Sequence, residues 1–527
     1  MSEHYSFLSK YARYFFSGTL LSRFSGMVRD MSMAAIFGDH PSVAAFMVAF
    51  RFSHFLRRVL GEGTMQSIFI PHYEELRLKD EKGASGFFFR LYVLLIALLI
   101  AIIASVEGSL SFSSWGGETE VLRLFAWMLP SLLFISLYGL NISLLQCQNS
   151  FFSSSVAPFA CNLVWIMAIF IFARQEVPMA MVNLALFTLI GFVVQWAITL
   201  PKTWKVLAMG SRHFVRPLFS LPTEIRSIGK ATFLGLIGVT AVQINSFLDM
   251  LFARYATVKG PIYLWYAIRL EQLPLAIVGF ACVYSIVPSL SRLIKGGELK
   301  EAENLFFFGY KRIFLLVVPC LFALFALGFA SVNLLFGRGH FSPDAVIQTT
   351  YCLWAYGLGL LPSTLTVYQS SLFYAFGDFK TPTRASLLSV TAHIGLNALF
   401  IFVLHWGAIS IALSTSFSAC LNYWILKRSF LKKGYWQITY PRLYSFWTLF
   451  AVCALALGCC LSVDCFCLTV FDQATALRGF VPQLLHWFGQ LGGFSAFFIL
   501  GAFLLDREML FAIKNLIFTE KSTFASL

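Results

Sequence analysis

Charged residues are scarce in this chain. Asp, Glu, Lys and Arg make up 12% of its 527 residues, whereas a soluble domain carries about 25%. Hydrophobic residues make up 58%, and Phe alone occurs 58 times. This balance excludes an ordinary water-soluble fold and indicates that most of the chain lies in a bilayer.

The motifs of several enzyme classes are also missing. The sequence has no HExxH, Walker A, GxSxG or Asp-rich prenyl-diphosphate motif. The 11 Cys lie mostly in apolar runs, without the Cys and His spacing of a zinc site. We therefore predict that the chain is not an enzyme, has no metal site or cofactor, and is not an ATP-driven pump. The polar first stretch, MSEHYSFLSKYARYF, predicts no cleavable signal peptide.

Apolar windows long enough to cross a bilayer, about 20 residues each, recur along the whole chain. Those centred near residues 27, 54, 242 and 275 are the more polar ones. We predict an all-α membrane protein with about 14 transmembrane helices, centred near residues 27, 54, 97, 134, 164, 189, 242, 275, 325, 361, 394, 418, 456 and 496.

The net charge of +14 would suggest nucleic acid in a soluble protein. Here the positions of the basic residues decide otherwise. With the N-terminus in the cytoplasm, the predicted cytoplasmic segments hold 27 Lys and Arg and the opposite side holds 5. This asymmetry predicts an even number of spans with both termini cytoplasmic, and no nucleic-acid partner.

Two parts of the sequence resemble each other. We expect SIFIP, with Pro71, to end the second predicted helix and SIVP, with Pro288, to end the eighth, 217 residues later. SLLQCQNSF and SLFYAFGDF begin 228 residues apart. We predict two six-helix lobes, 1–215 and 216–435, related by a pseudo-two-fold axis along the membrane normal, with helices 13 and 14 and a cytoplasmic tail in 436–527. Transporters with such repeats bind substrate between the halves. A duplicated scaffold or channel is the alternative.

Six arginines lie within the predicted helices 1, 2 and 8. An arginine at the bilayer centre costs about 2.5–3.5 kcal/mol on insertion scales, so such residues usually face a bundle interior or a wet cavity. They are Arg23, Arg29, Arg51, Arg57, Arg58 and Arg269. Arg51 and Arg269 occupy near-equivalent places in the repeat, so they could face each other across its axis.

Nearby acidic and amide side chains are fewer. Helix 1 has Asp30, helix 2 has Glu62, and helix 8 has Glu271 and Gln272. In the purely structural alternative, the charges pair internally: Arg29 or Arg23 with Asp30, Arg58 with Glu62, and Arg269 with Glu271. Even then three arginines are in excess. Guanidinium groups bind phosphate oxygens in pairs, so we predict a cavity for an anion.

At these residues the chain resembles the MurJ/MviN family, the lipid II flippases of the MOP exporter superfamily. The resemblance covers most of the chain. It is carried by LLSRFSGMVRD (20–30), VAFRFSHFLRRVLGEG (48–63), QINSFLDMLFA (243–253), YAIRLEQLP with SIVPSLSR (266–292), LLFGRGHFS (334–342) and FYAFGDFKTP (373–382).

The resemblance implies a transported lipid, lipid II: undecaprenyl diphosphate carrying the peptidoglycan disaccharide-pentapeptide. It implies movement from the inner to the outer leaflet of the bacterial cytoplasmic membrane, by alternating access, for cell wall biosynthesis. Family cavity arginines correspond to Arg23, Arg29, Arg57, Arg58 and Arg269. Helices 13 and 14, near 444–469 and 485–505, would form a groove for the lipid tail. Expected partners are lipid II, membrane lipids, and cell wall synthesis or division proteins.

The chain departs from the family pattern at acidic positions. Ala44 and Ile268 stand where the family often has Asp. Some members bind sodium through an Asp in helix 7 and an Asn/Asp pair in helix 11; Asp249 matches the first, and the helix 11 positions are His393 and Asn397. Asp249 and Asn397 are therefore the candidate cation or proton site, with a structural hydrogen bond as the alternative for Asp249. The coupling ion, sodium or proton, stays open.

Two other functions remain open at this point. The same architecture could serve a flippase for another polyprenyl-linked glycan, or a MATE-like drug exporter. A non-transporting membrane scaffold is the alternative from another class.

Overall fold

The computed structural model describes residues 2–60, 64–112, 119–148, 150, 152–212, 244–435, 444–470 and 479–505. Within these ranges the secondary structure is helical, with no strand, which confirms the predicted all-α class. The chain divides into two compact units, residues 1–251 and 252–527. The predicted division at residue 215 falls among residues 213–243, outside the described residues, and stays a prediction.

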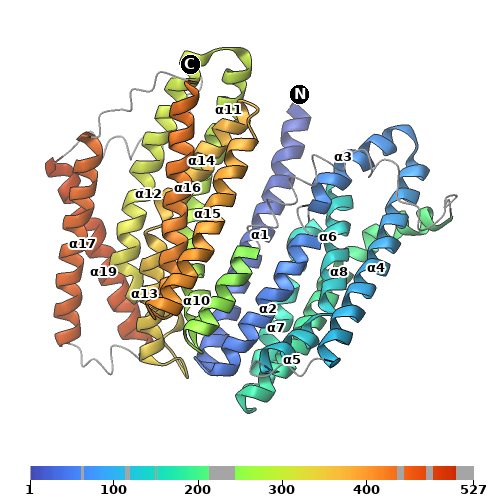
Figure 1. Cartoon of the computed structure of the whole chain (residues 1–527), viewed down its shortest axis with the longest axis horizontal. Coiled ribbons are helices and arrows are strands. Elements are labelled where there is room, and N and C mark those ends of the chain that lie inside the picture. The colour runs from blue at the N-terminus through green and yellow to red at the C-terminus, as the bar shows by residue number, and fades with distance from the viewer. Residues whose placement is uncertain are drawn as a thin grey trace. The chain divides into compact units, whose positions relative to one another are not determined.

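The first unit contains eight described helices in addition to the start of the helix over residues 244–256 (Figure 1). α1 packs along α7, and α8 packs against α4, α6 and α7. The helices are α1 (Ser2–Phe37), α2 (Pro41–Leu60), α3 (Thr64–Lys79), α4 (Glu81–Phe112), α5 (Thr119–Met128), α6 (Ser131–Cys147), α7 (Phe152–Ile171) and α8 (Val177–Arg212).

Close backbone contact between α4 and α8 requires a residue without a side chain. A Cβ built on Gly210 of α8 would lie 2.2 Å from the carbonyl oxygen of Ser85 in α4. Gly108, near the other end of α4, has nothing within 4 Å of such a Cβ. The first position therefore determines how closely the two helices approach, and the second tolerates a side chain.

The second unit is built in a similar order. Its helices are α10 (Gly260–Pro274), the π-helix η1 (Leu275–Phe280), α11 (Ala281–Gly296), α12 (Leu299–Phe336), α13 (Pro343–Gly357), α14 (Leu360–Ala375), α15 (Lys380–Ala398), the π-helix η2 (Leu399–Val403), α16 (Ile409–Lys433), α17 (Tyr444–Val470) and α19 (Phe480–Leu505).

The two repeat prolines do not end their helices, contrary to the sequence-based expectation. Pro71 lies inside α3 and Pro288 inside α11. Proline is tolerated within helices of membrane proteins because neighbouring groups satisfy the backbone carbonyl that loses its partner. The two prolines thus mark the same feature of the repeat, a helix that continues past them.

The predicted fourth and tenth helices are both broken. α5 and α6 are bent by 43° at their junction. α13 and α14 are separated by a short turn at Leu358 and Gly359, where a Cβ on the glycine would meet the side chain and backbone of Ser416 in α16. The same interruption in both units supports the internal repeat.

A polar contact closes the turn before the fifth helix of each repeat. In the first unit Lys202 of α8 donates to Ser150 at 2.6 Å. In the second, Lys433 of α16 pairs with Asp378, which also accepts from the backbone and hydroxyl of Thr381. Partial burial alone would raise the pKa of Asp378, but the bonds from Lys433 and Thr381 outweigh it and hold that pKa at about 2.

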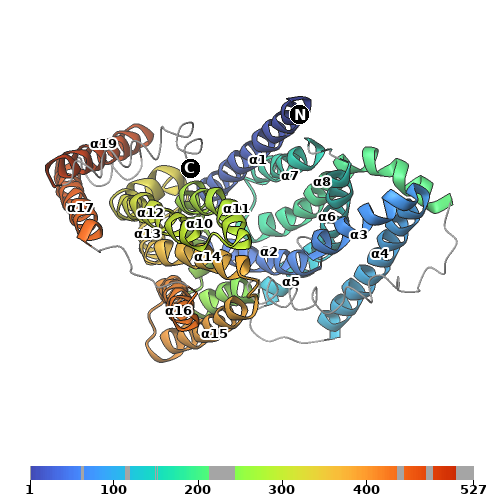
Figure 2. The same ribbon diagram turned by 90° about the horizontal axis from the view of Figure 1, so that it is seen from above.

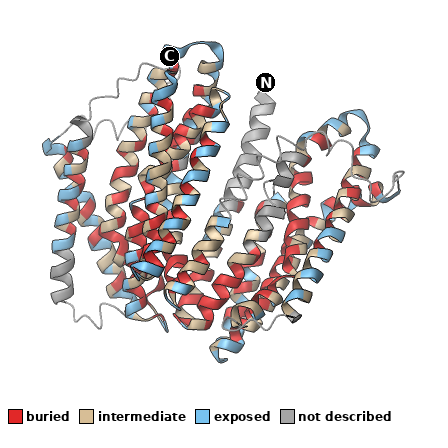
Figure 3. Cartoon of the chain, in the orientation of Figure 1, coloured by how far each residue is buried: buried red, intermediate tan, exposed pale blue. Residues whose placement is uncertain are grey.

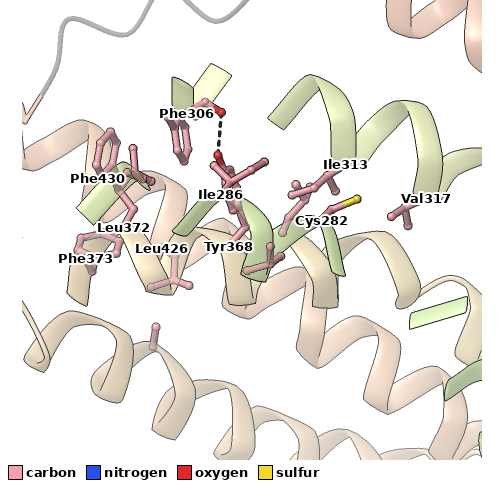
Figure 4. Packing of buried hydrophobic residues seen from close by; sticks show 14 of the residues in the cluster. Cys282, Ile286, Phe306, Ile313, Val317, Tyr368, Leu372, Phe373, Leu426 and Phe430 are labelled. Atoms are coloured by element: carbon pink, nitrogen blue, oxygen red, sulfur yellow. Dashed lines mark hydrogen bonds between the residues drawn. The ribbon is translucent and has the colours of Figure 1, made fainter. Parts of the chain in front are cut away.

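The main core of the second unit lies among α11, α12, α14, α15 and α16 (Figure 4). Tyr368 of α14 is fully buried there, stacks on Phe306 and donates its hydroxyl to the Phe306 carbonyl at 3.0 Å. Tyrosine is well suited to this position because its ring fills the core while its hydroxyl finds a backbone acceptor.

Helices α17 and α19 lie side by side and pack on α12 (Figure 2). Their bounds agree with those predicted for helices 13 and 14. Three side chains of α19 on one face are buried or hydrogen-bonded: Gln483 donates to Asn333 Oδ1 and to the Gly337 carbonyl, Trp487 donates to Ser331, and Gln490 is buried two turns from Gln483. The contacts of Gln483 and Trp487 form a polar seam that fixes α19 against the end of α12.

By length and composition, the described residues contain seven helices able to cross a membrane, or eight if α5 and α6 form one bent span. Shorter apolar helices cover Pro41–Ser53, Ser155–Ile171 and Trp447–Ser462. The predicted span centres coincide with described helices except the one near residue 242, which lies outside the described residues. The total of 14 stays a prediction.

Candidate functional site

Arg29 lies in the most elaborate polar cluster of the first unit. Its Nε and Nη2 donate to Asp30 Oδ1 at 3.0 and 2.7 Å, and its Nη1 donates to Asn162 Oδ1 of α7 at 3.0 Å. The guanidinium carbon lies 4.3 Å from the ring centre of Trp165. Arg29 and Asp30 are both buried. The structural pairing proposed for Asp30 therefore exists, and its partner is Arg29.

Small residues let α1 approach α7 at this cluster. Asn162 Nδ2 donates to the Ser22 carbonyl at 3.1 Å and to Ser25 Oγ at 2.9 Å. A Cβ on Gly26 would stand 3.7 Å from the same amide nitrogen. Residues with little side-chain volume on this face thus allow one amide to bridge two turns of α1.

Arg23 differs from Arg29 because its side chain is exposed on α1. The two arginines are six residues apart, which rotates them by roughly 120° around the helix. One faces α7, and the other remains accessible.

Arg51 follows a fully buried segment, residues 42–50 of α2 (Figure 3). It is half-buried, and its Nη2 donates to Ser246 Oγ at 3.1 Å. The next residue, Phe52, lies 4.6 Å from Phe247, measured between ring centres. The side chains of Arg57 and Arg58 and the whole of Glu62 lie outside the described residues.

In the second unit, Arg269 is half-buried and lies over the ring of Trp265, which is one turn earlier in α10. The distance from the guanidinium carbon to the ring centre is 4.7 Å. Glu271 is buried and Gln272 is exposed, so only the first belongs to the interior. The π-helix η1 begins three residues after Gln272. Such π segments are common at functional sites, so the π-helix after α10 favours a functional role for this part of the chain.

The candidate cation or proton site has one buried centre. Asn397 is fully buried in α15, and its Nδ2 lies 3.2 Å from His393 Nε2. Thr415 Oγ1 of α16 lies 3.5 Å from the same nitrogen. Asp249 is half-buried in the helix over 244–256. The π-helix η2 begins two residues after Asn397.

The structure therefore joins some predicted residues and leaves others apart. Arg29 and Asp30 form one cluster in the first unit, while Arg269 and Glu271 lie on α10 of the second. The proposed opposition of Arg51 and Arg269 stays a prediction. Sequence reasoning missed Asn162 and Trp165. The signal for Asn162 was its place within an apolar span, because polar groups in membrane helices are costly and are therefore often functional.

The geometry can hold and orient anions. Guanidinium groups present several donors in one plane, and the flanking Trp rings favour the cation on their faces. The Asp30 carboxylate neutralises Arg29, so a bound anion has to compete with this carboxylate for the guanidinium group. Phosphate oxygens are suited to this competition because each accepts several charge-assisted hydrogen bonds.

Comparison with known proteins defines the family. The family model described as lipid II flippase MurJ matches residues 33–479. A "probable lipid II flippase MurJ" of Chlamydia muridarum is 32% identical over 391 residues, 73% of this chain and 71% of its own length. Its counterpart in Vibrio cholerae is 28% identical over 440 residues, 80% of this chain and 82% of its own.

Solved structures agree in fold. A lipid II flippase MurJ in an inward closed conformation matches with a TM-score of 0.74 at 21% identity, over 94% of this chain and 99% of its own. An inward-facing MATE multidrug transporter of the MOP superfamily matches with 0.61 at 16% identity, over 80% and 99%. The resemblance found in the sequence is confirmed: this multi-pass membrane protein belongs to the MurJ family of lipid II flippases.

Proposed function

We propose that this chain moves lipid II, the undecaprenyl-diphosphate-linked peptidoglycan precursor, from the inner to the outer leaflet of the bacterial cytoplasmic membrane by alternating access. Family membership across residues 33–479 carries the proposal. The arginines within its helices support it, because a diphosphate is the part of this lipid that guanidinium groups recognise. The chain then serves cell wall biosynthesis and needs no catalytic centre.

The diphosphate-binding residues we propose are the six helix arginines, with Arg23, Arg29 and Arg269 as the testable core. Arg23 is exposed, and Arg269 is half-buried with its guanidinium over the ring of Trp265. Arg29 is paired with Asp30, and we propose that Arg29 orients the diphosphate as well as attracting it.

Helices α17 and α19 are proposed to guide the lipid tail. They are anchored on α12, and large apolar side chains such as Leu455, Leu485 and Phe488 are exposed on them. An exposed apolar surface on membrane helices suits an isoprenoid chain as it suits ordinary lipid.

The test is complementation of a bacterium depleted of its own lipid II flippase. Arg23→Ala, Arg29→Ala and Arg269→Ala should each insert normally and fail to restore growth. Arg292→Ala is the matched control, because Arg292 is not among the six helix arginines and, within the described residues, donates only to Ser289 on its own helix. Full complementation by all three site variants would overturn the proposed site.

A drug-like cation is the second cargo class to test, because a MATE transporter has a similar fold. That likeness, at 16% identity, concerns the fold alone. Native mass spectrometry of the purified protein separates the possibilities: co-purified lipid II supports the proposal, and another polyprenyl-linked glycan or a drug-like cation without lipid II contradicts it. A scaffold predicts that neutralising the arginines has no effect.

We further propose that coupling at the Asn397 site uses a proton rather than sodium. His393 lies beside Asn397, and histidine is one of the residue types that form proton relays in transporters. Asp249 is proposed to contribute a carboxylate. Transport by proteoliposomes should continue when choline replaces sodium and should stop in His393→Gln; loss of transport without sodium would contradict this.

Orientation and partners complete the proposal. We place both termini in the cytoplasm, because the basic residues favour that side by 27 to 5. The partners are lipid II, membrane lipids, and proteins of cell wall synthesis or division, and nucleic acid is not among them. A reporter that is active only in the cytoplasm should be active when it is fused to either terminus.

A further inference from the structure

Two side chains of α7 contact Arg29 and have no part in the function proposed above. Asn162 accepts a hydrogen bond from the guanidinium, and Trp165 lies under its face. They are three residues apart, so they project from neighbouring positions on one side of the helix. Both are more than nine-tenths buried. The question is what they do for an arginine that already has a carboxylate partner.

The orientation of the Asn162 amide is determined by its other contacts. Its nitrogen donates to the Ser22 carbonyl and to Ser25 Oγ, so its oxygen must face Arg29. A flipped amide would place its oxygen against the Ser22 carbonyl, where two acceptors would meet. The amide therefore always presents an acceptor to Nη1 of Arg29.

Asp30 alone does not determine the orientation of the guanidinium. Both bonds from Arg29 converge on one carboxylate oxygen, and neighbouring residues on a helix point about 100° apart. The third bond, to Asn162, and the indole face supply the missing constraints. Within the described residues, three of the five N–H donors of Arg29 are engaged.

Trp165 also extends the cluster to α2. Its ring lies 5.6 Å from that of Phe46 and 4.7 Å from that of Phe50, both in edge contact. Phe50 directly precedes Arg51. The indole ring thus packs between the helix of Arg29 and the helix of Arg51, inside one unit.

We propose that Asn162 and Trp165 are positioning residues for substrate binding, acting through Arg29. They hold its guanidinium in one plane against Asp30, so that the remaining donors meet a diphosphate without a prior loss of side-chain freedom. Ordering a long side chain costs conformational entropy, and the contacts with Asn162 and Trp165 meet this cost before the substrate binds. The inference rests on the proposed function, because it assumes that Arg29 contacts the diphosphate of lipid II.

The test measures binding of lipid II to the purified full-length protein in nanodiscs. Asn162→Ala and Trp165→Leu should each weaken binding about tenfold, which corresponds to about 1.4 kcal/mol. Trp165→Phe should recover most of the affinity, because it keeps an aromatic face and the indole nitrogen has no hydrogen-bond partner in the described residues. Asn141→Ala is the control: Asn141 is also buried, but its amide donates to Thr199 of α8.

A double-mutant comparison separates positioning from mere structure. In an Arg29→Lys background, where the planar fork is absent, Asn162→Ala should have no further effect on lipid II binding. An equal loss in both backgrounds, or a loss no larger than that of Asn141→Ala, would overturn the inference. If Arg29→Ala itself leaves binding and transport unchanged, the proposed diphosphate site fails instead. Thermal melting of each variant identifies any that does not fold.

Discussion

Gln483 should be essential for fixing α19 to the rest of the second unit. It is 1% exposed and donates to Asn333 Oδ1 at 3.2 Å and to the Gly337 carbonyl at 2.9 Å. Gly337 directly follows Phe336, the last residue of α12, so its carbonyl has no partner within that helix. Replacing Gln483 by Leu keeps the volume and removes both donors.

The expected cost follows from these contacts. Interhelical hydrogen bonds in membrane proteins contribute about 0.6 kcal/mol each on average, with a maximum of about 1.7. A buried acceptor left without a donor adds roughly 1–3 kcal/mol. Together they predict that Gln483→Leu lowers the free energy of unfolding by about 2–4 kcal/mol.

The same helix supplies a matched control. Gln490 is equally buried two turns later, but within the described residues its side chain is hydrogen-bonded only to His486 of its own helix, at 3.4 Å. Gln490→Leu should therefore be neutral or slightly stabilising. The assay is reversible unfolding in mixed micelles with increasing SDS. Equal effects of the Gln483 and Gln490 substitutions would refute the anchoring role of the polar seam.

Three further predictions concern packing and charge. Gly210→Ala should prevent close packing of α4 and α8 and cost about 1–3 kcal/mol or more, whereas Gly108→Ala should melt like the wild type. Asp30→Asn should lower stability by about 3–5 kcal/mol, because it leaves the buried Arg29 charge uncompensated, and replacing both residues by Leu should recover most of the loss; a fully stable Asp30→Asn variant would contradict this. Asp378→Asn should lower the melting temperature equally at pH 7 and pH 4, because the pKa of Asp378 is about 2 and its stabilising contribution is lost only as the pH falls through that value; a difference that disappears by pH 4 would contradict it.

Hydropathy and charge predicted most of the fold because they report on the bilayer, which acts on each helix separately. The spans centred near residues 456 and 496, which are α17 and α19, followed from apolar length alone. The course of the chain past Pro71 and Pro288 did not, since a proline ends a helix only when no neighbour satisfies the freed carbonyl. The break between α13 and α14 depends on how closely Gly359 approaches α16, which is a tertiary contact.

The candidate site was only partly predictable for a related reason. Helical spacing placed Arg23 and Asp30 on one face, but Asp30 pairs with its neighbour Arg29. Asn162 and Trp165 of α7, more than 130 residues later in the chain, contact Arg29 and favour it over Arg23 as the partner of Asp30. A single helix cannot reveal which of its arginines meets another helix, so the sequence indicated the surplus of positive charge but not its arrangement.

Lipid II transport itself is tested most directly by measuring the leaflet in which lipid II resides. In bacteria whose only lipid II flippase is this protein, acute depletion should cause lipid II to accumulate in the inner leaflet and disappear from the outer leaflet within minutes. Re-expression of the wild type should reverse the change, and Arg269→Ala should not. An unchanged leaflet distribution after depletion would contradict the proposed function.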